Sequence, residues 1–130
     1  MNNQEYKQML IERSYRFAVT TMRLIDNVDY RDFSIKIIAN QLLRSATSIG
    51  ANITEAQAAS SRKDFANFLQ YALKSSNEAK YWLRLFRDSG KTKKEQIDIL
   101  LKEVTELSNL LASSILSIKG KKLLTPNCNF

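Results

Sequence analysis

Residues 44–56 read RSATSIGANITEA, a stretch in which small and polar residues interrupt a regular helical pattern. Apolar residues recur every three or four positions from about Phe33 to Ala58, at Ile35, Ile38, Leu42, Ala46, Ile49, Ile53 and Ala56. This spacing places them on one side of an α-helix. A glycine inside a helix costs about 0.5–1 kcal/mol relative to alanine, so Gly50 needs a packing reason. We expect it to let a neighbouring helix approach closely.

A polar arc borders the apolar arc of this helix instead of lying opposite to it. A second segment with small residues, ALKSSNEA at 72–79, offers a matching surface. We expect the two to pack through a polar seam made of Ser45, Ser48, Asn52 and Ser75. If the contact closes over Asn52 and Glu55, both side chains need hydrogen-bonding partners, for which Ser75, Tyr71 and the backbone-bonding serines are candidates. The seam either fixes the register of a helical bundle or forms a ligand or nucleic-acid site. The residues assigned to this seam or to an interface are Arg44, Ser45, Ser48, Asn52, Glu55, Ser75, Glu78 and Trp82.

Three further segments have the same helical period. They run from about Asn3 to Ile25, from about Arg62 to Ser89 and from about Lys93 to Lys119. The connections are short, which makes consecutive helices antiparallel neighbours. The sequence therefore predicts an all-α fold, an antiparallel up-down-up-down four-helix bundle. We expect a single domain over residues 1–130, with an irregular C-terminal tail at 120–130.

The chemistry of the predicted helix ends supports these boundaries. Ser61 with Asp64 predicts an N-terminal cap for the third helix, and Thr92 with Glu95 forms a T-x-x-E capping box for the fourth. Gly90 and Gly120 occupy positions where left-handed C-terminal caps are expected.

Aromatic and apolar residues cover about half the circumference of the third helix, which is wider than one core requires. Trp82, Tyr71 and Tyr81 belong to this wide arc. One interpretation is a subunit interface beside the core. The other is that these side chains wrap the edges of their own bundle.

The chain is basic, with 20 lysines and arginines against 13 acidic residues, a net charge of +7 and a pI near 9.6. One cluster of cations spans the third helix and the following loop, at Lys74, Lys80, Arg84, Arg87, Lys91, Lys93 and Lys94. A second patch contains Lys119, Lys121 and Lys122. No DNA-reading motif accompanies them, so we expect salt-sensitive binding to the backbone of RNA or DNA. The alternative is an adaptor that docks an acidic partner or a nucleic-acid enzyme such as a reverse transcriptase.

The residue inventory argues against catalysis and against a cofactor or metal. The chain has no histidine, the commonest general base and metal ligand. Cys128 is the only cysteine, which excludes an internal disulfide, and no base is available to activate it. Glu55 and Glu78 are the only plausible buried carboxylate pair, without the Glu-x-x-His motifs of a bundle metal site. The N-terminus lacks a signal pattern and no apolar run is long enough for a membrane span, so we expect a cytoplasmic protein.

Two stretches, QLLRSATSIGANITEA at 41–56 and DFANFLQYALKSSNEAKYWLRL at 64–85, resemble a family of small bacterial four-helix-bundle proteins. These proteins are encoded in intervening sequences of large-subunit ribosomal RNA genes and are similar to accessory variability proteins of diversity-generating retroelements. The matching positions are Arg44, Ser45, Ser48, Ile49, Asn52, Ile53, Glu55, Phe65, Leu69, Ala72, Ser75, Glu78 and Leu83. Thr54 and Ala56 depart from the family pattern, as does Gly50. The resemblance implies a homo-oligomeric ring, typically a pentamer, with a basic surface for nucleic acid.

Overall fold

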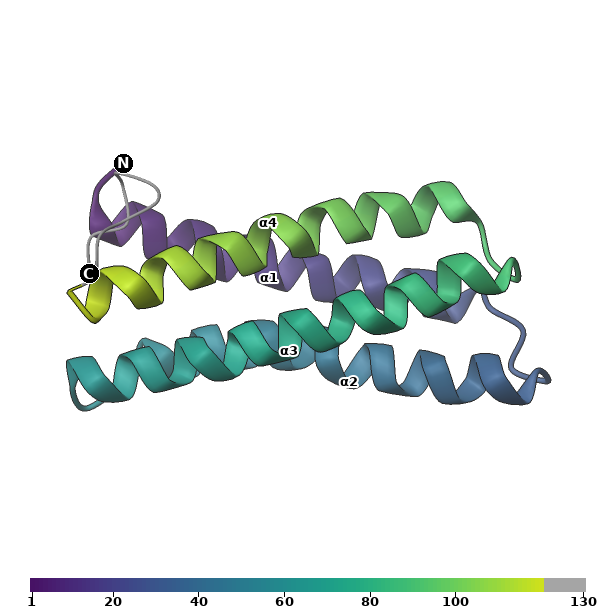
Figure 1. The fold of residues 1–130 in the computed structure, drawn as a ribbon, viewed down its shortest axis with the longest axis horizontal. Coiled ribbons are helices and arrows are strands. Elements are labelled where there is room, and N and C mark those ends of the chain that lie inside the picture. Colours follow the sequence, from purple (N-terminus) through teal and green to yellow (C-terminus); the bar gives the residue numbers. More distant parts are fainter. Residues whose placement is uncertain (121–130) are drawn as a thin grey trace.

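The computed structural model describes residues 1–120, which form four long helices. They are α1 (Asn3–Asp26), α2 (Phe33–Ala56), α3 (Arg62–Ser89) and α4 (Lys94–Ile118). The helices lie side by side and alternate in direction (Figure 1). The closely packed pairs of helices are α1 with α2, α2 with α3, α3 with α4 and α4 with α1. The expected up-down four-helix bundle is confirmed.

The helix boundaries lie close to those expected from the sequence. The expected bounds of α3 are confirmed, and α4 is one residue shorter at each end than expected. The α2 helix ends at Ala56, two residues before the expected Ala58. There the N–H groups of Gln57 and Ala58 bond to carbonyls three residues back, at 3.1 and 3.0 Å. These tighter bonds close the last turn and end the α-helical ladder.

The expected cap of α3 is confirmed, whereas that of α4 is wrong. Ser61 Oγ accepts a hydrogen bond from the Asp64 N–H at 3.0 Å. Gly90 ends α3 with φ +68°, in the left-handed region that favours glycine. In α4 the N-cap residue is Lys93, which makes no side-chain cap bond. Because the helix begins one residue later than the capping box requires, Thr92 does not cap it, and its buried hydroxyl has no hydrogen-bond partner. Gly120, with φ +72°, follows the last residue of α4 as expected.

All four helices contribute large side chains to one continuous core. The largest fully buried side chains are Phe17 of α1, Leu42, Ile49 and Ile53 of α2, Leu69, Leu83 and Phe86 of α3, and Ile97, Val104, Leu107 and Leu111 of α4, together with Leu10. Burial of each such side chain contributes about 1.5–3 kcal/mol relative to exposure. Arg13 of α1 links this helix to α4 by forming ion pairs with both Glu103 and Glu106.

Gly50 marks a close approach between α1 and α2. A Cβ built on Gly50 would lie 3.3 Å from Ser14 Oγ, tighter than ordinary van der Waals contact. Ser14 is fully buried, and its hydroxyl donates to the Ile11 carbonyl at 3.1 Å. The packing reason expected for this glycine is therefore present.

Candidate nucleic-acid interface

Four of the seven cations predicted around α3 are exposed and form no ion pair among residues 1–120: Lys74, Arg84, Lys93 and Lys94. Lys74 and Arg84 lie on α3, while Lys93 and Lys94 begin α4 after the short loop. Their charges are available to a ligand without first breaking an ion pair. We name these four residues the free cations.

The other three cations of that cluster bond within the protein. Lys80 turns toward α4, where its Nζ donates to Ser108 Oγ at 2.8 Å, and burial lowers the pKa of its ammonium group. Arg87 Nε lies 3.0 Å from Asp88 Oδ1. Lys91 Nζ lies 2.6 Å from the Oδ2 atom of Asp32, the N-cap residue of α2. The surface with unpaired charge is therefore smaller than the sequence cluster.

Lys119, the described residue of the second basic patch, lies at the other end of the bundle. Lys119 is exposed at the C-cap of α4, whereas Lys93 and Lys94 lie at its start. A helix of 25 residues separates them by about 38 Å. Lys121 and Lys122 lie outside the described residues. Lys119 therefore lies on a different part of the protomer from Lys93 and Lys94.

The side chains of the polar seam bond to their own helix and not across it. Ser45 is 3% exposed and its hydroxyl donates to the carbonyls of Gln41 and Leu42, both at 3.1 Å. Ser48 Oγ donates to the Arg44 carbonyl at 2.7 Å, and Asn52 Nδ2 donates to the Ser48 carbonyl at 2.9 Å. Asn52 therefore needs no partner on α3, because its short polar side chain reaches a carbonyl one turn back. Ser75 is half-buried, and α2 and α3 make the most extensive helix contact of the bundle.

The one plausible buried carboxylate pair is not buried, because both Glu55 and Glu78 are exposed. Arg44 is exposed as well. Glu78 Oε1 accepts a hydrogen bond from the Trp82 indole N–H at 3.2 Å within α3. This bond satisfies the polar group of Trp82 inside the protomer.

The wide apolar arc of α3 is used mostly within the bundle. Trp82, Phe65, Phe68 and Leu73 are partly buried and pack against the core. This packing matches the interpretation that the aromatic residues wrap the bundle's own edges. Two tyrosines of the arc, Tyr71 and Tyr81, stay about half exposed.

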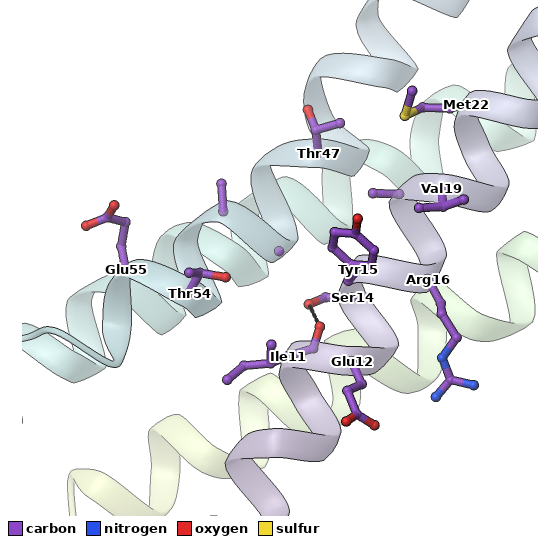
Figure 2. Close-up of a pocket in the computed structure, with 13 residues that line it drawn as sticks. Ile11, Glu12, Ser14, Tyr15, Arg16, Val19, Met22, Thr47, Thr54 and Glu55 are labelled. Atoms are coloured by element: carbon purple, nitrogen blue, oxygen red, sulfur yellow. Dashed lines mark hydrogen bonds between the residues drawn. The ribbon is translucent and has the colours of Figure 1, made fainter.

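A groove between α1 and α2, with a volume of about 840 Å³, was not anticipated from the sequence. Figure 2 shows Tyr15, Val19 and Met22 of α1 facing Thr47 and Thr54 of α2 across it. Its surface is mostly apolar, and Tyr15 is 69% exposed. The sequence feature that could have indicated this groove is the pair of small residues Gly50 and Ala51, whose size leaves the space open. The groove is a candidate surface for a protein partner, including a second copy of the chain.

Neither a metal site nor a membrane span is found in the part of the chain that the structure describes. Within residues 1–120, no three cysteine or carboxylate side chains gather where they could hold a metal ion. No helix among these residues combines the length and the apolar composition needed to cross a bilayer.

Comparison with known proteins identifies the family to which this chain belongs. A model of the 23S rRNA-intervening sequence protein family matches residues 7–113. A crystal structure of a protein of unknown function from the S23 ribosomal protein family of Bacteroides thetaiotaomicron VPI-5482 superposes with a TM-score of 0.75. It is 40% identical in sequence, over 82% of this chain and 97% of that one. A search of the curated proteins gave no match. On the family match and this similarity, the chain belongs to the 23S rRNA-intervening sequence proteins.

Proposed function

We propose that this protein is a non-catalytic homo-oligomer that binds the phosphate backbone of nucleic acid. The observation that carries the proposal is the set of free cations, Lys74, Arg84, Lys93 and Lys94, which project from α3 and from the start of α4. The net charge of +7 favours the approach of a polyanion at long range.

Backbone binding fits the chemistry of these side chains. Lysine ammonium groups act as flexible point charges that pair with phosphate oxygens and carry no sequence information. Each phosphate neutralised releases condensed counterions, so affinity falls steeply as salt rises. We therefore expect binding that tolerates many sequences and depends strongly on ionic strength.

Self-association is the second part of the proposal. The family resemblance implies a pentameric ring, and the groove between α1 and α2 offers an exposed apolar surface beside Tyr15 and Met22. Large exposed apolar patches on small proteins commonly mark interaction sites. In a ring, each protomer would repeat the free cations, which multiplies weak backbone contacts.

A charge-reversal experiment tests the binding surface. The variant Lys74→Glu/Arg84→Glu should bind fluorescein-labelled 20-nucleotide RNA at least ten-fold more weakly than the wild type at 50 mM salt. The matched control, Arg23→Glu/Lys36→Glu, changes the net charge equally at exposed positions on α1 and α2. Equal loss in both variants would mean that only net charge matters. Absence of wild-type binding to this RNA and to an RNA duplex of the same length would contradict the proposal and favour docking of a protein partner.

A further inference from the structure

Two exposed tyrosines on α3 each lie beside an exposed cation. Tyr71 is 53% exposed and Tyr81 is 55% exposed. Lys74 follows Tyr71 by three residues, and Arg84 follows Tyr81 by three residues. Residues three apart on a helix are surface neighbours. The sequences YALK at 71–74 and YWLR at 81–84 therefore place the same pair of groups on α3 twice.

The spacing of the two pairs suits an extended ligand. Ten residues of α-helix separate Tyr71 from Tyr81 by about 15 Å along the axis. At about 100° per residue the two tyrosines lie roughly 80° apart around the helix, with Lys74 in the arc between them. The surface formed by Tyr71, Lys74, Tyr81 and Arg84 is named here the tyrosine–cation surface.

The rings of both tyrosines are held by half-buried aromatic neighbours. The Tyr81 ring meets the Trp82 ring edge-to-face, with centroids 5.0 Å apart and planes at 77°. The Tyr71 ring meets the Phe68 ring in the same way, at 6.3 Å and 79°. Phe68 and Trp82 pack against the core. Each exposed ring is therefore oriented in advance, which lowers the entropic cost of stacking against a ligand.

The charge along this part of α3 suits a polyanion. Between Phe65 and Asp88 the helix carries four cations and two carboxylates, and Asp88 pairs with Arg87, so Lys74 and Arg84 are the exposed cations without an ion pair in this part of α3. The Glu78 carboxylate accepts the Trp82 indole N–H at 3.2 Å.

On the basis of the proposed function, we infer that the tyrosine–cation surface binds single-stranded nucleic acid. Tyr71 and Tyr81 stack against unpaired bases, while Lys74 and Arg84 pair with the adjoining phosphates. Stacking on aromatic side chains tolerates any base, because every base has a π face. Bases inside a duplex are stacked on each other and cannot reach these rings, so the surface distinguishes single strands from duplexes.

The test compares a 20-nucleotide unstructured RNA, the DNA of the same sequence and a 20-base-pair RNA duplex. Tyr71→Ala/Tyr81→Ala should weaken binding to both single strands by at least about 30-fold, as expected for the loss of two base stacks. Duplex binding should stay within two-fold, and the salt dependence should not change. Lys74→Ala/Arg84→Ala should instead weaken binding to all three probes and lower the salt slope.

Three control variants separate stacking from other effects. Tyr71→Phe/Tyr81→Phe keeps both rings and should bind single strands as the wild type does, whereas Tyr71→Leu/Tyr81→Leu keeps only apolar bulk and should bind weakly. Tyr30→Ala removes a 44% exposed tyrosine from the loop between α1 and α2, outside both the groove and α3, and should have no effect.

Specific outcomes would overturn the inference. The inference of base stacking would be wrong if Tyr71→Ala/Tyr81→Ala weakened binding to single strands and duplex equally. It would also be wrong if Tyr71→Leu/Tyr81→Leu bound single strands as tightly as Tyr71→Phe/Tyr81→Phe. Wild-type binding to duplex alone would overturn this inference and leave the proposed function standing. Failure of the wild type to bind any of the three probes would overturn both.

Discussion

Gly50 of α2 lies so close to Ser14 of α1 that a Cβ on Gly50 would stand 3.3 Å from Ser14 Oγ. This contact fixes how tightly α1 and α2 pack and leaves the floor of the groove between them open. We predict that Gly50→Leu destabilises the protein by about 1–3 kcal/mol, because the larger side chain overpacks this contact. Gly50→Ala should change stability by less than about 1 kcal/mol, since its gain in helix propensity offsets a small shift of Ser14. Urea unfolding measures both, and an unchanged leucine variant would contradict the close approach.

A second prediction concerns Ser45, the one fully buried residue of the polar seam. Its hydroxyl bonds inside α2, so the position needs a small side chain and not a partner on α3. Ser45→Leu should cost about 1–3 kcal/mol in the free energy of unfolding through overpacking. Thr47→Leu, at an exposed position on the same helix, should stay within about 0.5 kcal/mol. Equal costs in the two variants would show that the seam is not closely packed.

The third prediction is a dependence of stability on pH through Asp32. Hydrogen bonds from Lys91, the Ile35 N–H and Ser34 lower the pKa of the Asp32 carboxyl from 3.8 to about 2. Because the folded state has the lower pKa, this contribution is present above about pH 4 and is lost as pH falls toward 2. Asp32→Asn retains a good N-cap residue but removes the titrating group. Its urea midpoint should therefore fall less than that of the wild type between pH 4 and pH 2, and parallel curves would contradict the assignment.

Self-association gives the fourth prediction. Light scattering at micromolar concentration should report a mass of about 75 kDa, five times the 14.9 kDa of one chain. If the groove between α1 and α2 forms the contact, Ala51→Glu should lower the mass, because it places an unpaired charge on this apolar surface. A mass near 15 kDa for the wild type would contradict self-association, the second part of the proposed function.

Local features of the fold were predictable from sequence, whereas features that depend on distant partners were not. The period of apolar residues, the Ser61 cap and Gly90 are local, and the helices follow from them. The predicted cap at Thr92 failed because two candidate starts lie one residue apart and local chemistry does not separate them. Lys91 pairs with Asp32, a residue 59 positions away. No sequence pattern reveals such a pairing, so Lys91 was included in the predicted basic cluster.

The exposure of the tyrosines on α3 was also not predictable from the sequence. The wide arc of α3 was visible in the sequence, but the division into half-buried Trp82 and exposed Tyr81 depends on how far each side chain reaches around the bundle edge. The groove beside Tyr15 likewise depends on the separation of two helices. Such features require the packed structure.

The most direct test of the central claim is a salt titration of wild-type protein with the 20-nucleotide single-stranded RNA, followed by fluorescence anisotropy. Four phosphate contacts per protomer, one for each free cation, predict a slope of log K against log salt of about −2.8. Affinity should therefore fall by about 50-fold between 50 and 200 mM salt. A Kd that does not change over this range, or no binding at 50 mM to either this RNA or the 20-base-pair RNA duplex, would contradict the claim that these cations hold a nucleic-acid backbone.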